Sequence, residues 1–172
     1  MDAVAARFLT GLTGQVELID PAAAVTYVDI DDTIRRSYGY AKRGSGYGYS
    51  GVKGLNAVLG TVSSATRAPV IVATRLRKGS ANSARGAARL VAESLKTTRA
   101  CGVSGTVILR ADSAYYGADV VAAARRGGAH FSITARRDRA VTAAISAIAG
   151  NSWTEDPLPQ SSVRRRTESV GV

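Results

Sequence analysis

The chain has 172 residues, which is enough for one α/β domain with a buried core but leaves little room for two. Its hydrophobic content of 45% and charged content of 21% exclude a disordered chain, and its formal charge of +10 favours a polyanionic partner. Most of the 23 basic residues are arginine, which suits bidentate binding of phosphate, although a GC-rich coding sequence would also enrich arginine.

Residue counts also limit the chemistry. With one cysteine, Cys101, no intrachain disulfide can form, and with one histidine, His130, a zinc site built from His and Cys is nearly excluded. No apolar run approaches the length of a membrane span, and the first residues lack the pattern of a secretion signal. We therefore expect a cytoplasmic protein with no membrane partner.

The first half of the chain predicts one helix followed by several strands. Residues 1–14 carry apolar side chains at helical spacing, and we take residues 1–24 as a residual N-terminal helical segment. Runs rich in β-branched residues predict strands, at residues 25–31, 34–40, 55–62 and 70–76. By periodicity alone, segment 55–62 could equally be a buried helix instead of a strand.

The second half alternates helices with short strands. Beyond Gly150 the periodicity ends, and we expect residues 151–172 to form a disordered tail. The elements predicted before it are a helix over 84–100, a strand over 106–109, a helix from Ser113 or Gly117 to Gly127, a strand over 130–134 and a helix over 140–148.

This order predicts an α/β fold with a mixed sheet flanked by helices. Early hairpins give antiparallel strands, and the later βαβ crossovers place a strand parallel to an earlier one. Sites in such sheets form beyond the carboxyl ends of strands, where Asp31 and Asp112 both stand. If strands 25–31 and 106–111 are neighbours, these two carboxylates meet.

Three acids, Asp29, Asp31 and Asp32, crowd the end of the first strand in the sequence VDIDDT. They could lie in a solvated turn, or they could bind a divalent metal, because like charges this close are costly without a cation. With Asp112, their oxygen ligands suit Mg²⁺ or Mn²⁺. Such a site can support in-line phosphoryl displacement, and the net charge favours a nucleic-acid backbone as substrate.

Two further segments are candidates for DNA binding. The glycine-rich sequence over 41–54 is either a flexible basic loop whose tyrosines stack on unpaired bases or a hairpin loop whose tyrosines cover a sheet edge. The cations that end strand 70–76 could contact phosphate, or they could form a solvated strand end. The residues concerned are Lys42, Arg43, Tyr47, Tyr49, Arg75, Arg77 and Lys78.

Four segments, in this order and at this spacing, carry a resemblance to a known family. They are VDIDDT, YGYAKRGSGYGYSGVKG, RLRKGSANS and ILRADSAYYG. Together they resemble the DDE-type transposases of bacterial insertion sequences, which have a ribonuclease-H-like catalytic domain. The similarity spans about residues 25–149 and implies a domain over 25–150.

The resemblance implies a role for individual acids. Asp112 matches the second catalytic acid of the family, and Asp31 matches the first because it stands two residues before Thr33. Asp32 competes with Asp31 for this role, and Asp29 is a more distant alternative. Asp31 and Asp112 would then be the metal ligands, for Mg²⁺ or Mn²⁺.

The same resemblance implies DNA transposition, by metal-dependent phosphodiester cleavage and strand transfer at insertion-sequence ends. It implies double-stranded DNA as the partner, oligomers among full-length relatives, and a place on the bacterial nucleoid. The family's third acid, a later Glu, has no clear match, so we expect a truncated domain that is inactive alone. The acids considered for that position are Asp138, Glu155, Asp156 and Glu168.

Two other functions remain as alternatives. VDIDDT also resembles the nucleophile motif of haloacid-dehalogenase-like phosphatases, in which Asp29 would attack phosphorus and Asp31 would act as general acid and base. The later lysine and acidic pair of that family are not found here. A non-catalytic basic DNA-binding domain would instead bind through its arginines, with affinity falling steeply as salt rises.

Overall fold

The central strand of the sheet, β1 (Val25–Arg36), is longer than the sequence predicts. It pairs with β3 (Lys53–Ser63) in an antiparallel ladder that runs from Tyr27 to Arg36 without a break. The expectation of a separate second strand over 34–40 is therefore wrong. The ladder holds the strand extended through its acidic residues, so the alternative that these residues lie in a solvated turn is wrong. These details come from a computed structural model that describes residues 2–38 and 42–153.

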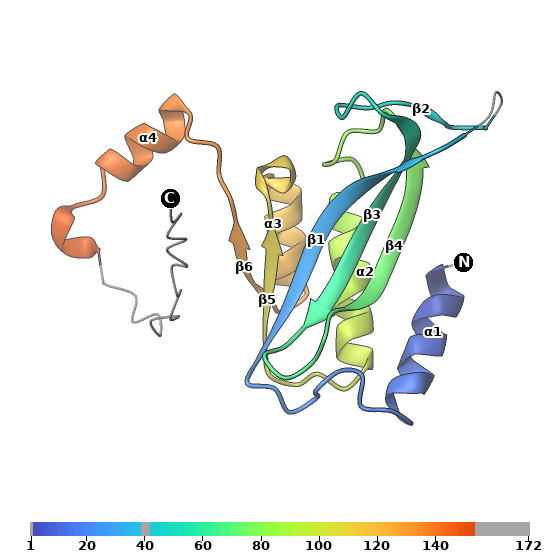
Figure 1. The fold of residues 1–172 in the computed structure, drawn as a ribbon. Helices are drawn as coiled ribbons and strands as arrows, with labels where there is room; N and C mark the ends of the chain where they lie inside the picture. The colour runs from blue at the N-terminus through green and yellow to red at the C-terminus, as the bar shows by residue number, and fades with distance from the viewer. Residues whose placement is uncertain (1, 39–41, 154–172) are drawn as a thin grey trace, which may run out of the picture. The chain divides into compact units, whose positions relative to one another are not determined.

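The remaining strands confirm the expected mixed sheet, in which antiparallel strands precede the crossovers (Figure 1). β3 pairs antiparallel with β1 on one side and with β2 and β4 on the other, whereas β5 pairs parallel with β1 and β6 parallel with β5. The additional strands are β2 (Gly46–Tyr47), β4 (Val70–Lys78), β5 (Thr106–Ala111) and β6 (His130–Ile133).

Two helices form the crossovers and cover the same face of the sheet. They are α2 (Ala87–Ala100), between β4 and β5, and α3 (Ala118–Arg126), between β5 and β6. The 3₁₀ helix η1 (Ser113–Tyr115) lies between β5 and α3. The predicted helices and strands of this half are therefore observed, with ends shifted by a few residues.

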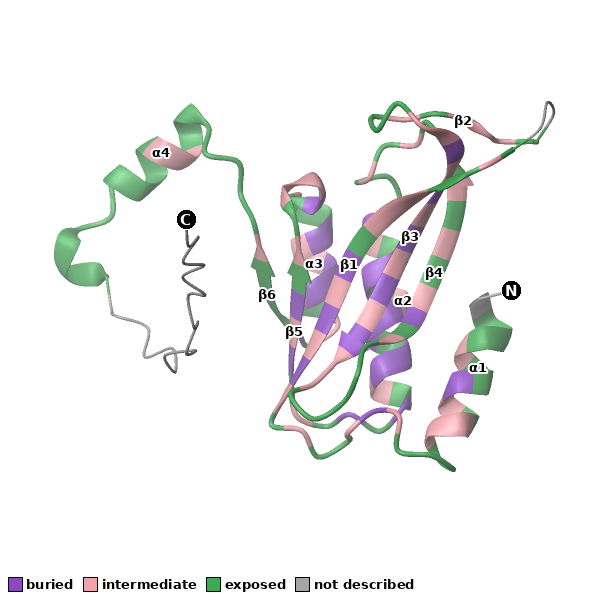
Figure 2. Cartoon of the chain, viewed as in Figure 1, coloured by how far each residue is buried: buried purple, intermediate pink, exposed green. Residues whose placement is uncertain are grey.

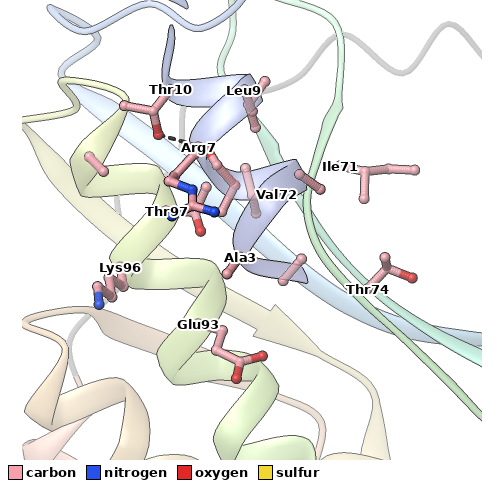
Figure 3. Close-up of a pocket in the computed structure, with 14 residues that line it drawn as sticks. Ala3, Arg7, Leu9, Thr10, Ile71, Val72, Thr74, Glu93, Lys96 and Thr97 are labelled. Atoms are coloured by element: carbon pink, nitrogen blue, oxygen red, sulfur yellow. Dashed lines mark hydrogen bonds between the residues drawn. The ribbon is translucent and has the colours of Figure 1, made fainter. Parts of the chain in front are cut away.

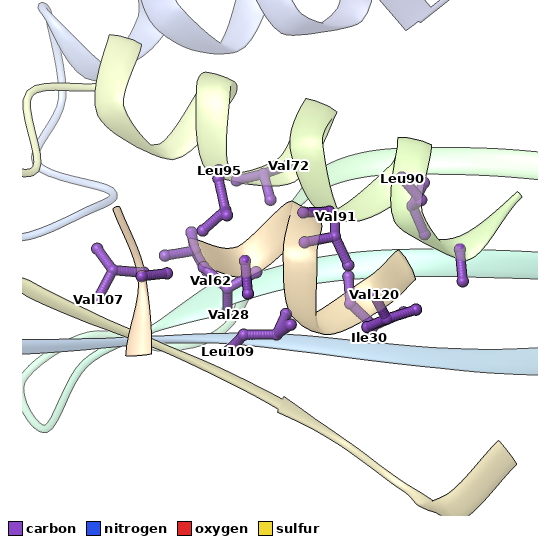
Figure 4. Packing of buried hydrophobic residues seen from close by; sticks show 14 of the residues in the cluster. Val28, Ile30, Val62, Val72, Leu90, Val91, Leu95, Val107, Leu109 and Val120 are labelled. Atoms are coloured by element: carbon purple, nitrogen blue, oxygen red, sulfur yellow. The ribbon is translucent and has the colours of Figure 1, made fainter. Parts of the chain in front are cut away.

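The core lies between these helices and the sheet (Figure 4). Val28 of β1, Leu109 of β5 and Val91 of α2 are completely buried, and burial alternates along β1 and β3 as Figure 2 shows. Gly60 lets α2 approach closely, because a Cβ there would lie 2.1 Å from the Ser94 hydroxyl. Alternate residues of β1 therefore point into the core, and the residues between them point to the opposite face.

The N-terminal helix α1 (Asp2–Thr13) lies against α2 and β4, the strand at the edge of the sheet. Its Leu9 is buried, whereas Val4 and Phe8 are exposed. The three elements enclose a pocket of about 580 Å³ lined mainly by small apolar side chains, with Arg7 and Glu93 among its polar residues (Figure 3). α1 lies within the segment 1–24 that the sequence predicts to be helical, and it covers the first half of that segment.

The described chain divides into two compact units, one up to Arg136 and the other from Arg137 to residue 153. The second contains α4 (Arg139–Ser146) and the short helix η2 (Gly150–Ser152), and none of the residues of these two helices is buried. Most of the tail predicted to be disordered, residues 154–172, lies outside the described residues. Among the helices that are described, none is long and apolar enough to cross a membrane.

Candidate active site

Two aspartates directly follow the last paired residues of β1 and β5, although β1 itself continues to Arg36. The parallel register of these strands ends with Ile30 opposite Ala111, and the next residues are Asp31 and Asp112. Both residues are exposed. The register agrees with the prediction that strands 25–31 and 106–111 are neighbours, and Asp112 directly follows β5. Asp31, however, lies within β1, because pairing with β3 continues the strand to Arg36, so the prediction that Asp31 ends its strand is wrong.

Local hydrogen bonds orient each of the two carboxylates. The Oδ1 atom of Asp31 accepts the backbone N–H of Asp32 at 2.7 Å. Asp112 precedes η1, and its Oδ1 atom accepts the backbone N–H of Ala114 at 2.9 Å, as an N-cap residue does. Within residues 2–38 and 42–153, the second oxygen of each carboxylate has no protein hydrogen-bond partner.

This donor set fits a hard divalent cation. Mg²⁺ is commonly bound by one or two carboxylates, with water and substrate phosphate completing its coordination. Asp31 and Asp112 provide two such carboxylates, each with an oxygen free of protein partners in the described chain. No cluster of three or more His, Cys, Asp or Glu residues that could hold a metal is found in that part of the chain.

Asp32 points the other way, toward the face that the helices cover. Its side chain is 7% exposed, and its Oδ2 atom accepts hydrogen bonds from the Asn56 amide, from the Ser83 hydroxyl at 3.0 Å and from Arg77 at 3.2 Å. An anion this deeply buried needs such partners, because burial without them is very costly. Asp32 is thus held inside the protein, whereas Asp31 faces solvent.

Asp29 is held by an arginine on the neighbouring strand. Arg110 donates to both of its carboxylate oxygens, at 2.7 and 2.8 Å, and the guanidinium lies 4.2 Å from the centre of the Tyr27 ring. The hydrogen bond to Asp29 raises the pKa of Arg110. With both oxygens engaged, Asp29 is poorly placed to attack phosphorus, and the structure gives no support to the phosphatase alternative.

Tyr115, which the sequence analysis did not single out, lies beside the acids. It is 1% exposed, and its hydroxyl has no hydrogen-bond partner among the described residues. Burial raises its pKa, the charges of Asp32, Asp31 and Asp112 raise it further, and the charge of Arg77 opposes them. The aromatic residue that follows Arg-Ala-Asp-Ser in ILRADSAYYG was the available signal for this position.

A comparison with protein families assigns the chain. The family described as Transposase DDE domain matches residues 26–169, which is most of the sequence. The chain belongs to this family. A search of curated proteins finds no match.

Solved structures similar to this DDE domain include complexes of the Mos1 transposase. The Mos1 mariner paired-end complex with Mn is 13% identical, with a TM-score of 0.37, and the match covers 83% of this chain and 47% of that chain. The Mos1 strand transfer complex is 13% identical, with a TM-score of 0.35, and the match covers 82% and 45%. The DDE domain described here therefore spans less than half the length of these Mos1 chains.

The tyrosines of the DDE domain's glycine-rich segment lie on a hairpin formed by β2 and β3. Tyr47 is 68% exposed and Tyr49 is 81% exposed, so the rings face solvent and do not cover a sheet edge. The hairpin lies tightly against the turn after β4, because a Cβ on Gly79 would lie 2.1 Å from the carbonyl oxygen of Gly54. The neighbouring Lys42 and Arg43 are exposed, and residues 39–41 lie outside the described chain.

The three cations predicted at the end of β4 lie in different environments. Lys78 is exposed, whereas Arg75 forms an ion pair with Glu93 of α2 at 2.6 Å. Arg77 lies inside the protein with its side chain 11% exposed, and burial lowers its pKa despite the opposing charges of Tyr115 and Asp32. We therefore leave Arg77 out of the surface set that could contact DNA.

Proposed function

We propose that this domain takes part in DNA transposition by metal-dependent phosphodiester cleavage and strand transfer at the ends of an insertion sequence. Asp31 and Asp112 are the proposed catalytic acids and ligands of Mg²⁺ or Mn²⁺. The observation that carries the proposal is the parallel register of β1 and β5, whose last pair is Ile30 and Ala111, the residues directly before Asp31 and Asp112. Membership of the Transposase DDE domain family supports the same reaction.

The side chains have distinct tasks in this reaction. A bound divalent metal would supply activation of the attacking water or hydroxyl and stabilisation of the leaving oxygen. Asp31 and Asp112 would hold it through the carboxylate oxygens that have no protein partner in the described chain. The backbone N–H groups of Asp32 and Ala114 would keep both carboxylates oriented, so little reorganisation is needed when substrate phosphate arrives.

The proposed partner is double-stranded DNA at a transposon end. Exposed Tyr47 and Tyr49 on the β2–β3 hairpin could stack on bases unpaired near the cleavage site, and exposed Lys42, Arg43 and Lys78 could contact phosphates. The net charge of +10 supports such contacts. Full-length relatives would act as oligomers on DNA, and the proposed location of the protein is the bacterial cytoplasm, at the nucleoid.

We further propose that the 172-residue chain binds metal and DNA but does not cut DNA alone. The resemblance implies three acids for this reaction, and no group of three or more His, Cys, Asp or Glu residues that could hold a metal is found within residues 2–38 and 42–153. Glu155, Asp156 and Glu168, also considered for the third position, lie outside the described residues. Asp138, considered for the third position, caps α4 by accepting the backbone N–H of Val141 at 2.9 Å. This role explains Asp138 without a metal.

A non-catalytic basic DNA-binding domain is the second candidate function. It is favoured by the exposed tyrosines and cations of the hairpin, which would serve binding whether or not a metal is held. The two candidates differ in what they require of Asp31 and Asp112, because DNA binding through the hairpin needs neither carboxylate.

Titration with Mn²⁺, followed by calorimetry or by the EPR signal of the free ion, separates the two functions. The proposal expects the wild type to bind Mn²⁺, and it expects Asp31→Asn and Asp112→Asn each to abolish this binding. Asp29→Asn is the matched control, because Asp29 lies on the same strand and face as Asp31 but is bonded to Arg110. If Asp31→Asn and Asp112→Asn bind Mn²⁺ as the wild type does, the metal-dependent function is refuted. Salt-sensitive DNA binding in those variants would then favour the binding domain.

A further inference from the structure

Arg77 is the most extensively hydrogen-bonded side chain around the candidate site. Its Nε and Nη2 atoms donate to Asn56 Oδ1 at 2.9 and 2.6 Å, and Nη2 also donates to Asp32 at 3.2 Å. Its Nη1 atom donates to the backbone carbonyl oxygens of Asn82, Ser83 and Arg85 at 2.8–3.0 Å. All three nitrogens of the guanidinium are thus engaged within the protein.

The partners of Arg77 come from separate parts of the fold. Asp32 belongs to β1, Asn56 belongs to β3, and the three carbonyl groups belong to the segment between β4 and α2. The Ser83 hydroxyl donates to the same Asp32 oxygen that Arg77 and Asn56 contact. One guanidinium therefore links three strands to the segment 79–86, and lysine could not reproduce this planar set of donors.

The network also determines the charge next to the candidate metal ligands. Asp32 follows Asp31 directly, and its backbone N–H fixes the Asp31 carboxylate. Without Arg77, Asp32 would be a third negative charge, buried and lacking its counter-ion, in the same region as Asp31 and Asp112. With Arg77 the buried pair is neutral, and the Asp32 oxygen that it contacts already accepts three hydrogen bonds.

We propose that Arg77 and Asp32 are positioning residues, and that Arg77 keeps Asp32 out of the set of metal ligands while it fixes segment 79–86 to the acidic part of β1. This inference rests on the proposed function, because it takes Asp31 and Asp112 as the ligands. It assigns to Asp32 the role of a buried anchor rather than that of a catalytic acid.

The test measures affinity for Mn²⁺ alone in charge-changing variants. Arg77→Met removes a positive charge and should tighten Mn²⁺ binding by roughly 100- to 300-fold, the effect on a divalent ion of a unit charge roughly 10 Å away at an effective dielectric constant of about 20. Asp32→Asn removes a negative charge and should weaken binding by a similar factor. The double variant should return close to the wild-type affinity.

Two further variants keep the test decisive if these variants are poorly folded. Arg77→Lys retains the charge and should retain the Mn²⁺ affinity, while faster amide hydrogen exchange over residues 79–86 would report the lost carbonyl contacts. Arg75→Met is the matched control, because Arg75 is also an ion-paired arginine of β4 but pairs with Glu93. It should change Mn²⁺ affinity far less than Arg77→Met.

The possible outcomes separate this inference from the proposed function. If Arg77→Met weakens Mn²⁺ binding or leaves it unchanged, or if the double variant binds no Mn²⁺, then Arg77 does not keep Asp32 out of the set of metal ligands, and the inference fails. If Asp31→Asn and Asp112→Asn retain wild-type binding, the proposed function fails instead.

Discussion

Asn56 offers a direct test of how strongly the buried network stabilises the fold. It is 1% exposed, and its side chain makes three hydrogen bonds to charged partners, donating to Asp32 and accepting twice from Arg77. Asn56→Ala removes all three bonds and leaves both charges buried. Hydrogen bonds to charged groups contribute about 1.5–3 kcal/mol each.

The expected loss is smaller than three times that value, because both ions keep other partners. Asp32 retains Ser83 and Arg77, and Arg77 retains the carbonyl groups of the segment before α2. We therefore expect Asn56→Ala to lower the free energy of unfolding by about 3 kcal/mol, near the cost of one to two such bonds.

Urea denaturation followed by circular dichroism measures this loss, with Asn82→Ala as the control. Asn82 is exposed, and its side chain accepts one hydrogen bond, from the backbone N–H of Ala84 at 2.9 Å, so its truncation should cost about 1 kcal/mol or less. The reasoning is refuted if the two variants lose equal stability.

Three more outcomes follow from the structure. Tyr115→Phe should not destabilise the protein, because it removes a buried hydroxyl with no partner in the described chain, and thermal melting would show this. The raised pKa of Tyr115 means that the folded state binds its proton more tightly, so wild-type stability should fall as pH rises above about 10, and this loss should be smaller in Tyr115→Phe. Replacing Tyr47 and Tyr49 by alanine should weaken binding of single-stranded DNA by about 1–3 kcal/mol per stacked base. Replacing the exposed Tyr116 by alanine should not weaken it, and equal losses of affinity would contradict stacking on the hairpin. Gly79→Ala should displace the hairpin from the turn after β4 and accelerate proteolysis there, and an unchanged digestion pattern would show that the close backbone contact is unimportant.

The sequence predicted those parts of the fold that depend on local patterns. The β-branched run before Asp31 and the apolar strand before Asp112 identified β1 and β5, and the helices between later strands required a parallel crossover. These elements were sufficient to place the two acids on neighbouring parallel strands, although β1 continues beyond Asp31 to Arg36. The neighbour relation follows from topology and does not require knowledge of side-chain contacts.

The contacts that distinguish the competing acids were not predictable in this way. Asp29 is bonded to Arg110 and Asp32 to Arg77, and each pair joins residues on different strands. Such pairs depend on register and on which face of the strand a residue occupies. A one-residue difference along β1 places Asp31 toward solvent and Asp32 inside the protein, although both read as acids at the end of an apolar run.

Arg77 illustrates the same limit. A cation after a strand usually marks a solvated end, and the sequence analysis assigned it to DNA together with Lys78. Its burial depends on carboxylate, amide and carbonyl partners from three other segments, which meet only in the folded chain. Segment 34–40 was mistaken for a second strand for a related reason, since partners on β3 keep the acidic part of β1 extended.

The central claim, that Asp31 and Asp112 hold a divalent metal between them, is tested most directly by anomalous diffraction from crystals of the chain soaked in Mn²⁺. The account predicts anomalous density at the carboxylates of Asp31 and Asp112, with the Asp32–Arg77 pair intact. Density at Asp29 or Asp32 instead, or no ordered metal at this edge of the sheet, would contradict it.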